Sequence, residues 1–334
     1  MSNPSSHSHL IVVLILLQAV SACAPKRSGV LAYVSNERDG TISVIDTGTD
    51  RVVQTIKVGA RPRGIRVSSD KSRVYVALST PSGQNYNEAA NRIAAIDVAS
   101  GKVVAKYNIG SDPEQLAVSG DGKKLYASNE DAGTASVTDV ETSRLLATLI
   151  VGIEPEGVTI SPDGRWVYVT AETSNTVSVI DTQNDSVVAT FMVGSRPRDA
   201  AFSPDSSRAY VTAEIGRAVS VIDTSTHTVT KTIELPRGDG VKPMGVVVSV
   251  DGRKIYVALG RASAVAVLDA ASFNLVRTIP VGKRVWGLGI TPDGKKIYTA
   301  NGLSNDVSVI DTTTDQVIAT IPAGDGPWGI AISR

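Results

Sequence analysis

The chain has 334 residues, and its 33 Lys and Arg residues balance its 33 Asp and Glu residues. A net charge of zero excludes the strong basic field that draws proteins to nucleic acids or anionic membranes, so we expect no nucleic-acid partner. The single cysteine excludes an internal disulfide framework.

The N-terminus has the features of a targeting segment. The apolar run LIVVLILLQAV (10–20) is too short to span a bilayer and is typical of a signal-peptide core. The sequence Val20-Ser21-Ala22-Cys23 follows it and resembles a bacterial lipobox, with the only cysteine at the lipidated position. We therefore expect a lipoprotein-type signal peptide at 1–22, a tether at 23–28 and a lipid anchor on Cys23 as the only membrane contact.

The location of the protein follows from the same segment. Ala24 is not the aspartate associated with inner-membrane retention, so we expect a periplasmic protein anchored in the outer membrane. The residues before the apolar core contain no Lys or Arg, whereas lipoprotein signals usually carry positive charge. A secreted protein with an ordinary cleaved signal is therefore the alternative.

From residue 29 onward the chain is a tandem repeat. The aspartates that end VID-like runs are Asp46, Asp97, Asp139, Asp181, Asp223, Asp269 and Asp311. Their successive spacings are 51, 42, 42, 42, 46 and 42 residues. Seven units of about 42 residues are typical of the four-stranded blades of a β-propeller.

One unit shows how the strands follow one another. The β-branched run 157–161 ends at the turn Pro162-Asp163-Gly164, and the alternating segments 166–170, 176–181 and 186–193 follow. Neither face of 176–181 is strongly charged, so both faces need a covering neighbour, which radial stacking of blades supplies. We expect an all-β, seven-bladed propeller of four-stranded antiparallel blades over 29–334.

The two ends of the repeat region indicate how the ring closes. The chain enters the repeats at a second-strand motif (31–36) and stops after a first-strand motif (329–333). We predict that the C-terminal strand completes the first blade and that the closed ring is a monomer.

The repeat resembles a known family. VIDTGTDRVVQTIKVG (44–59), VIDTQNDSVVATFMVG (179–194) and VIDTTTDQVIATIPAG (309–324) are similar to the YVTN-type β-propeller repeat. The segments 112–131, 153–164, 283–312 and 326–329 resemble a seven-repeat group associated with pyrroloquinoline-quinone-dependent alcohol catabolism and transport. This resemblance implies a propeller and a genomic association, but no reaction and no catalytic residues.

Absent residue types exclude several chemistries. His227 is the only histidine after the signal, and its place in the turn TSTHT indicates a solvated turn residue. Multi-histidine metal sites, histidine-ligated haem and a Ser-His-Asp triad are therefore excluded. The aspartates of the VID runs and SPDG turns recur in most blades, so we interpret them as turn caps.

Positions that differ between repeats are the candidates for a binding site, because a site must break the symmetry of the repeat. In a propeller, the residues that open the innermost strands surround one mouth of the central channel, together with the loops between second and third strands. The strand entries are Arg61, Arg63, Asp112, Glu114, Glu154, Glu156, Arg196, Arg198, Asp199, Lys242, Arg284, Trp286, Asp325 and Trp328. The loops add Asn36, Glu130, Glu172, Glu214 and Asn301.

Two interpretations of this rim stay open. Arg and Glu residues that merely pair across blades would contribute about 0 to 1 kcal/mol each if exposed. Clustered tryptophans at a concave mouth favour a binding site instead. Arg forks and Trp faces would suit a small planar anion with several carboxylates, such as pyrroloquinoline quinone, and an acidic periplasmic protein is the alternative partner.

Three functional classes follow. The first is a non-enzymatic periplasmic binding module that has no cofactor. The second is a calcium-dependent lactonase or hydrolase, with oxygen ligands drawn from Glu114, Glu130, Glu156, Glu172 and Asn301. The third, a quinoprotein-type dehydrogenase, is disfavoured because the well-known quinoprotein alcohol dehydrogenases have eight blades and a different repeat.

Overall fold

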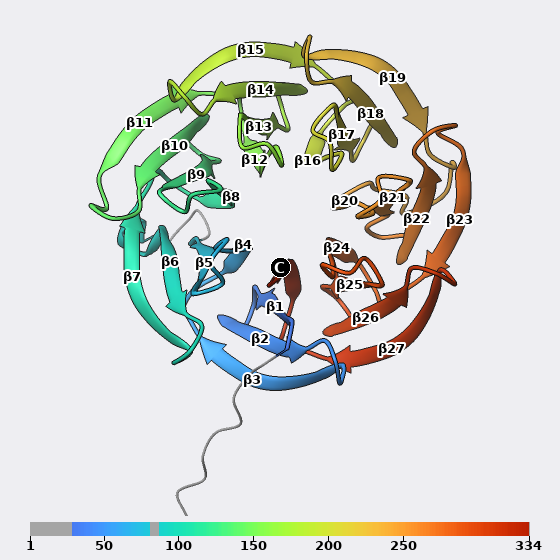
Figure 1. The fold of residues 1–334 in the computed structure, drawn as a ribbon, viewed down its shortest axis with the longest axis horizontal. Coiled ribbons are helices and arrows are strands. Elements are labelled where there is room, and N and C mark those ends of the chain that lie inside the picture. Colours follow the sequence, from blue (N-terminus) through green and yellow to red (C-terminus); the bar gives the residue numbers. More distant parts are fainter. Residues whose placement is uncertain (1–28, 81–86, 334) are drawn as a thin grey trace, which may run out of the picture.

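The computed structural model describes residues 29–80 and 87–333, in which the strands form seven four-stranded antiparallel sheets around one axis (Figure 1). This confirms the predicted seven-bladed propeller. The signal peptide, the tether and Cys23 lie outside the described residues. Within the described part of the chain, no helix has the length and apolar character needed to cross a membrane.

Each blade runs outward from the axis, and we number the blades 1 to 7 in chain order. The innermost strands of blades 1 to 7 are β28 (Pro327–Ile332), β4 (Pro62–Val67), β8 (Pro113–Val118), β12 (Pro155–Ile160), β16 (Pro197–Phe202), β20 (Val246–Val248) and β24 (Val285–Ile290). The second strands are β1 (Leu31–Asn36), β5 (Arg73–Leu78), β9 (Lys124–Asn129), β13 (Trp166–Ala171), β17 (Arg208–Ala213), β21 (Lys254–Ala258) and β25 (Lys296–Asn301).

The two outer layers complete the blades. The third strands are β2 (Thr41–Asp46), β6 (Arg92–Asp97), β10 (Thr134–Asp139), β14 (Thr176–Asp181), β18 (Ala218–Asp223), β22 (Ala264–Asp269) and β26 (Asp306–Asp311). The outermost strands are β3 (Arg51–Lys57), β7 (Lys102–Asn108), β11 (Leu145–Ile150), β15 (Ser186–Met192), β19 (Thr228–Glu234), β23 (Leu275–Pro280) and β27 (Gln316–Pro322). A 3-10 helix spans Glu88–Ala90.

The ring closes as predicted. Strand β28 pairs antiparallel with β1, so that Ala32 lies opposite Ile332 and Val34 opposite Ile330. The first blade therefore combines the C-terminal strand with the three strands nearest the N-terminus, in the order β28-β1-β2-β3.

The hydrophobic core lies between adjacent blades. Strand β1 is buried at every position, whereas β19 is exposed at all but Ile233, because the middle strands have neighbours on both faces and the outermost strands do not. Tyr168 of blade 4, for example, is fully buried against Ala209 and Val211 of blade 5. Packing between blades therefore explains why the second and third strands read as apolar on both faces.

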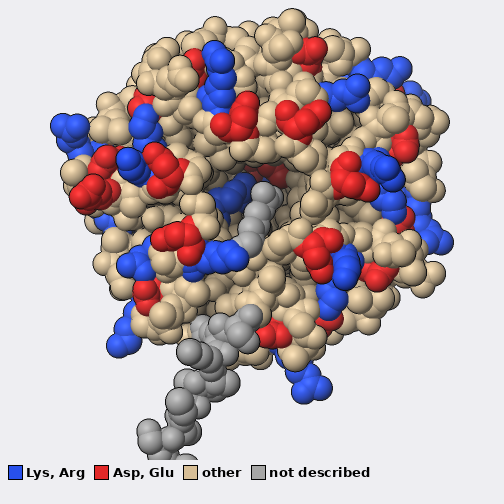
Figure 2. All heavy atoms as spheres, viewed as in Figure 1, with Lys and Arg blue, Asp and Glu red and all other residues tan. Residues whose placement is uncertain are grey.

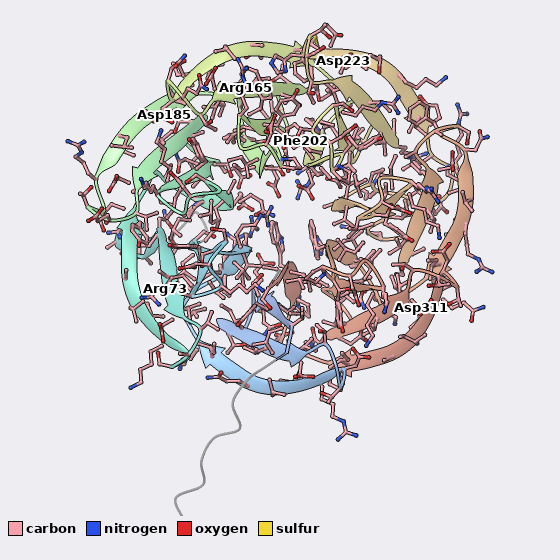
Figure 3. The ribbon with its side chains drawn as sticks, viewed as in Figure 1. Arg73, Arg165, Asp185, Phe202, Asp223 and Asp311 are labelled. Carbon is pink, nitrogen blue, oxygen red and sulfur yellow. The ribbon has the colours of Figure 1, made fainter. Side chains whose placement is uncertain are left out.

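A polar contact also joins adjacent blades. In blade 3, Lys124 Nζ donates to Asp185 Oδ2 at 2.7 Å and the Tyr126 hydroxyl donates to Asp185 Oδ1 at 3.0 Å, with Asp185 lying in the outer turn of blade 4 (Figure 3). Lys254 and Tyr256 bind Asp315 in the same way. The repeated tyrosine therefore carries a hydroxyl that fastens each of these blades to the next.

His227 occupies the equivalent turn position in blade 5. Its Nδ1 forms a 2.8 Å hydrogen bond with the Tyr168 hydroxyl, and its ring meets Trp166 edge to face at 4.7 Å. Burial lowers the pKa of the imidazole. The interpretation of His227 as a merely solvated turn residue was therefore incomplete, because the ring is half-buried and replaces the aspartate of this inter-blade contact.

The aspartates of the VID runs cap turns, as interpreted from the sequence. Asp46 Oδ1 accepts hydrogen bonds from Gly48 N at 3.0 Å and Thr49 N at 2.8 Å. Asp311 does the same for the amides of Thr313 and Thr314. These carboxylates stabilise turns of the scaffold, so we assign them no catalytic or binding role.

Candidate functional site at the channel mouth

The innermost strands all begin at one end of the axial channel, which we call the entry mouth. The second residue of six of these strands, together with Met244 just before β20, forms the inner layer of the mouth. This layer consists of Arg63, Glu114, Glu156, Arg198, Met244, Trp286 and Trp328. Arg61, Asp112, Glu154, Arg196 and Arg284 each precede such a strand and adopt a positive φ between 35° and 57°. This left-handed residue turns the chain sharply into the channel.

The basic residues of blade 2 are held by carboxylates from the two neighbouring blades, 1 and 3. Arg63 pairs with Glu114 and, through Nε, with Glu37 Oε1 at 3.1 Å. Arg61 lies 3.1 Å from Glu37 Oε1 and 3.7 Å from Asp112 Oδ1. The sequence-based list did not include Glu37, although its position between second and third strands matches that of Glu130.

A second network surrounds Arg198. Arg198 pairs with Glu172 and lies 3.0 Å from Glu156 Oε1. Arg196 Nε lies 2.6 Å from Glu172 and 3.3 Å from Glu214, and Lys242 Nζ donates to Glu214 at 2.8 Å. Side-chain pairing across blades, the alternative weighed from the sequence, therefore engages most of the basic rim.

The two tryptophans form the opposite wall of the mouth. Trp286 and Trp328 stack with ring centroids 6.2 Å apart and planes inclined at 26°. The guanidinium carbons of Arg63 and Arg198 lie 5.7 Å and 5.6 Å from the centroids of Trp328 and Trp286. These two arginines therefore stand between the carboxylates and the aromatic wall.

Arg284 differs from the other rim cations. Its guanidinium stacks on Trp286, with the central carbon 4.6 Å from the ring centroid, and none of the ion pairs found among the described residues involves it. Burial and the nearby Arg261 lower the pKa of Arg284. Arg284 is therefore the rim cation that is least engaged by the protein's own carboxylates.

Two acidic residues of the sequence-based list lie at the outer edge of the mouth. Asp325 pairs with Arg38 at 2.6 Å, and both side chains are nearly half exposed. Glu154 is exposed and accepts a hydrogen bond from the Thr173 hydroxyl. These carboxylates face solvent, so the structure does not bring them to the channel.

Blade 3 carries a compact group of acidic side chains. Carboxylate oxygens of Asp112, Glu114 and Glu130 lie within 4.8 Å of one another. Apart from their arginine partners, Asp112 Oδ1 and both oxygens of Glu114 have no hydrogen-bond donor among the described residues, although both side chains are buried. Burial, followed by the charges of Glu156 and Asp112, raises the pKa of Glu130 to about 8. Glu130 therefore holds a proton at neutral pH.

Asn36 and Asn301 do not line the mouth. Both are fully buried at the ends of β1 and β25. Asn36 Nδ2 donates to Thr41 Oγ1 and Ser43 Oγ, and Asn301 Nδ2 donates to Asp306 Oδ1 and Ser308 Oγ. These side chains connect second to third strands, so their role is structural.

Below the mouth, glycine marks where the innermost strands approach one another. The residues that follow the inner layer are Gly64, Gln115, Gly157, Asp199, Gly245, Gly287 and Gly329. A Cβ on Gly157 would lie 2.4 Å from the carbonyl oxygen of Arg198, and one on Gly287 would lie 2.7 Å from that of Trp328. Gln115 and Asp199 interrupt this ring of glycines.

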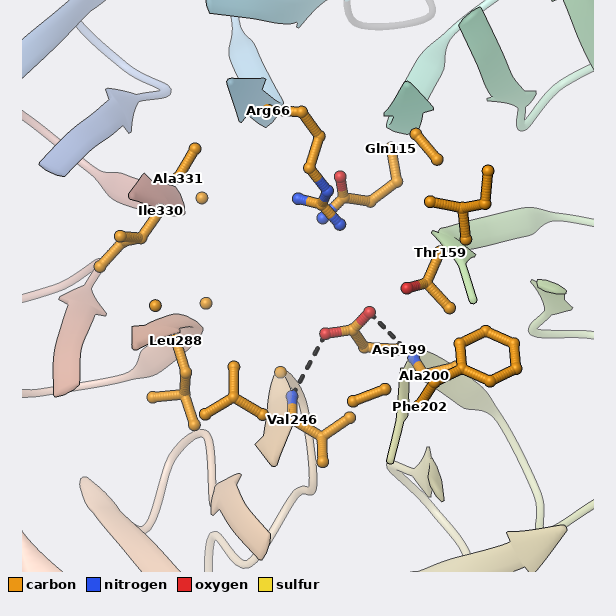
Figure 4. A pocket seen from close by; sticks show the side chains of 18 of the residues that line it. Arg66, Gln115, Thr159, Asp199, Ala200, Phe202, Val246, Leu288, Ile330 and Ala331 are labelled. Carbon is orange, nitrogen blue, oxygen red and sulfur yellow. Dashed lines mark hydrogen bonds between the residues drawn. The ribbon is translucent and has the colours of Figure 1, made fainter. Parts of the chain in front are cut away.

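The channel is a cavity of about 460 Å³, and Figure 2 shows the hollow at the centre of the ring. Arg66 from β4 and Asp199 from β16 point toward one another inside it, with Gln115 beside Arg66 (Figure 4). Asp199 accepts hydrogen bonds from Ala200 N at 2.9 Å and Val246 N at 3.2 Å. Burial raises the pKa of Asp199 despite these donors and the charge of Arg66.

The two halves of the channel differ in the charge of their innermost strands. Strands β4, β8, β12 and β16 supply all the charged side chains of the innermost layer. Strands β20, β24 and β28 read VVV, VWGLGI and PWGIAI and contain no charged residue. The channel is therefore polar on blades 2 to 5 and apolar on blades 6, 7 and 1.

Comparison with known proteins adds a family to this geometry. The choice-of-anchor I domain matches residues 5–200, which is more than half of the chain. The chain belongs to the choice-of-anchor I domain family. The family described as "Lactonase, 7-bladed beta-propeller" matches a shorter stretch, residues 186–317.

One curated relative of this choice-of-anchor I protein is the seven-bladed beta-propeller protein Rv1057 of Mycobacterium tuberculosis. It is 32% identical over 110 residues, which cover 33% of this chain and 26% of the relative. The chain therefore matches only about a quarter of the length of that relative.

Solved structures share the fold at low identity. A putative 6-phosphogluconolactonase from Bacteroides fragilis superposes with a TM-score of 0.76 at 19% identity, covering 92% of this chain and 99% of the other. The hydrazine synthase of Kuenenia stuttgartiensis gives a TM-score of 0.74 at 23% identity, covering 85% and 92%. At these identities the likeness is one of fold.

The sequence of this choice-of-anchor I protein predicted the residues of the rim but not all the charged and polar residues inside the channel. Arg66 and Gln115 were not among the candidates, and Asp199 was placed on the rim although it lies inside the channel. The sequence does contain a signal for these channel residues. Five blades have glycine directly after the inner-layer residue, whereas Gln115 and Asp199 stand at that position in the other two blades.

Proposed function

We propose that this protein is a non-enzymatic binding module whose axial channel holds a small ligand with an apolar part and a polar part. The observation that carries the proposal is the division of the channel into a charged half and an apolar half. Repeats that serve only the scaffold have no reason to differ in this way, since every blade meets the axis in the same manner. A cavity of about 460 Å³ is within the size range of small-molecule sites.

The geometry changes the expected chemistry of the ligand. A planar anion with several carboxylates would need several rim arginines, but Arg61, Arg63, Arg196 and Arg198 already pair with carboxylates of the protein. Arg284 and the stacked tryptophans are the part of the rim that still suits such a ligand. Pyrroloquinoline quinone therefore enters the test as one probe, in keeping with the association of the repeat with quinone-dependent alcohol catabolism.

A thermal-shift screen of the full-length protein, purified in detergent, tests this function. The screen uses amino acids, pyrroloquinoline quinone, organic acids, lactones and divalent metals. A compound that binds the folded state raises the melting temperature according to its concentration relative to Kd. Binding that Trp286→Ala weakens, and that the outer-surface variant Glu234→Gln leaves unchanged, supports a channel site. If no compound shifts the melting temperature, the proposal is wrong.

We place this module in the periplasm, anchored by a lipid on Cys23, on the basis of the signal-like segment and the lipobox-like sequence. Mass spectrometry of the mature N-terminus tests the anchor. A diacylglyceryl-modified Cys23 at the N-terminus supports it, and an unmodified Cys23 overturns it.

A second candidate function is a calcium-dependent lactonase, which the acidic group and the match at residues 186–317 favour. Asp112, Glu114 and Glu130 offer the hard oxygen ligands that Ca²⁺ prefers. Glu172 and Asn301 leave the ligand set expected from the sequence, since Glu172 binds two arginines and Asn301 binds Asp306 and Ser308. Metal analysis at one Ca²⁺ per chain together with calcium-dependent lactone hydrolysis would support this function. Finding almost no Ca²⁺ in the purified protein would count against it.

A further inference from the structure

We propose that the channel site selects a zwitterion with an apolar side chain, such as an apolar α-amino acid, through Arg66 and Asp199. The inference rests on the proposed binding function and names the class of ligand. It is carried by the placement of one guanidinium and one carboxylate that face each other in a channel that is apolar on blades 6, 7 and 1 (Figure 4).

The charge of the site restricts what it can accept. The cavity is lined by two arginines, Arg66 and Arg198, and by two carboxylates, Glu156 and Asp199, so a ligand of zero net charge leaves the charges of the lining balanced. A simple anion would place its carboxylate near Asp199 as well as near Arg66, and a simple cation would meet the guanidinium. Burying a charge without a partner is costly, so the site disfavours both.

Each end of a zwitterion finds a matching group. The guanidinium of Arg66 donates to the carbonyl oxygens of Ile65 at 2.9 Å and Val158 at 3.4 Å. A guanidinium has five N–H donors, so its planar fork also suits a carboxylate, and the amide of Gln115 lies beside it as a further polar contact (Figure 4). The carboxylate of Asp199 is fixed by the amides of Ala200 and Val246. Each of its oxygens retains a lone pair that is able to accept an ammonium proton.

The state of Asp199 supports this inference. Burial raises its pKa, and Arg66 together with two backbone donors does not offset that effect. A cation beside the carboxylate would favour its charged form and compensate for the burial. The ammonium group of the ligand supplies this charge.

The apolar half of the channel sets the third requirement. Val246, Leu288 and Ile330 belong to the lining of the cavity on blades 6, 7 and 1, although most of each side chain is buried in the core between blades (Figure 4). An aliphatic side chain of the ligand is stabilised when it leaves water to pack against them, and each buried methylene adds to the effect. A ligand with both ionic groups but no side chain lacks the stabilisation that comes from burying apolar surface.

Symmetry indicates that the arrangement is specific to a site. Asp199 and Gln115 stand where five other blades have glycine, and the positions equivalent to Arg66 hold Ala, Thr, Val or Gly. The scaffold needs neither charge, because the remaining blades close the ring without one.

Isothermal titration calorimetry on the full-length protein tests the inference with four probes. The probes are L-leucine, its decarboxylated analogue 3-methylbutylamine, its deaminated analogue 4-methylpentanoate, and glycine. We expect L-leucine to bind at least tenfold more tightly than each of the other three. Equal affinity for L-leucine and either single-charge analogue would overturn the inference, and this comparison needs no variant.

Variants locate the site. Asp199→Asn removes the charge and keeps an acceptor oxygen for one of the two backbone amides, and we expect it to weaken leucine binding at least tenfold. Arg66→Gln should have an effect of similar size, and Glu234→Gln, on the exposed outer strand of blade 5, should have none. Melting curves without ligand verify that each variant is folded. Unchanged affinity in both folded channel variants overturns the inference.

The failure of this inference is distinguishable from the failure of the proposed function. If pyrroloquinoline quinone, an organic acid or a lactone binds in the channel and no amino acid does, the zwitterion inference is wrong and the binding function stands. If no compound of any class binds, both are wrong.

Discussion

Glu130 makes the stability of the protein depend on pH. Its pKa in the folded protein is raised to about 8 by burial and by the charges of Glu156 and Asp112, against about 4.3 in an unfolded chain. The folded state therefore retains a proton that the unfolded state has released between these values. Stability must fall as the pH rises through this window, because the folded state then binds more protons than the unfolded state.

Glu130→Gln removes this titration while keeping a side chain of similar shape. We expect the melting temperature of the variant, relative to wild type, to increase between pH 5 and pH 9. Scanning calorimetry in the presence of a chelator measures the difference without contribution from a bound cation. Glu154→Gln, at an exposed position of the same mouth, is the control for the loss of a rim carboxylate. If the difference in melting temperature between Glu130→Gln and wild type is constant from pH 5 to pH 9, Glu130 does not titrate in this window.

Arg198 and Arg196 offer a matched pair at the rim. Arg198 is only 10% exposed and pairs with the buried Glu156 and Glu172, whereas the Arg196 side chain is 43% exposed. Removing Arg198 leaves buried carboxylates without their main partner, so Arg198→Ala should cost about 3 to 5 kcal/mol. Arg196→Ala should cost about 1 kcal/mol or less, because Arg198 still binds Glu172. Urea unfolding measures both, and equal losses would contradict the assigned pairing.

The sequence predicted the members of this network but not its partners. Arg, Glu and Trp residues at strand entries were recognised because they differ between repeats. The spacing along the chain does not show which blade a long side chain reaches, so Arg284, which stacks on Trp286, could not be distinguished from Arg198, which binds carboxylates. The raised pKa of Glu130 was inaccessible for the same reason, since it depends on neighbours from other blades.

At the scale of the element, the innermost strands depend on glycine at their closest approach. The carbonyl oxygen of Arg198 would lie 2.4 Å from a Cβ at Gly157, and this backbone group cannot move without shifting β16. We expect Gly157→Ala to destabilise the protein by about 1 to 3 kcal/mol, as overpacking does elsewhere.

Gly120 provides the control for this substitution. It follows the innermost strand of blade 3, and a Cβ there would meet nothing within 4 Å. Gly120→Ala should therefore leave the denaturation midpoint nearly unchanged. A Gly157→Ala variant as stable as Gly120→Ala would show that the strands are not packed as closely as described.

Strand positions were largely predictable because alternation and turn residues are local signals. The segments 31–36 and 176–181 match β1 and β14, and the segment 186–193 exceeds β15 by one residue. Strand β20 departs from the pattern, with three residues where the other innermost strands have six. The connection that precedes β20 is longer than those that precede most other innermost strands. The short length of β20 becomes visible only in its pairing with the neighbouring strand.

At the scale of the whole molecule, the ring closes where strands from the two ends of the described chain pair with one another. Strand β28 provides the backbone partners of Ala32, Tyr33 and Val34 in β1. Ser333 adds hydrogen bonds with Leu31 through its amide and its Oγ, both at 2.8 Å. Closure removes the edge that β1 would otherwise expose.

Deleting residues 329–334 tests this closure. The truncated chain loses four of the six residues of β28 and uncovers the faces of blades 7 and 2 that pack on them, so we expect the melting temperature to fall by many degrees. A synthetic peptide of residues 325–334 added in excess should restore part of the loss, because it binds the folded ring and not the unfolded chain. A peptide of the same composition in scrambled order should not, since it cannot place Ile330 and Ile332 toward the core. A truncated protein that melts at the wild-type temperature would mean that the ring does not depend on this strand.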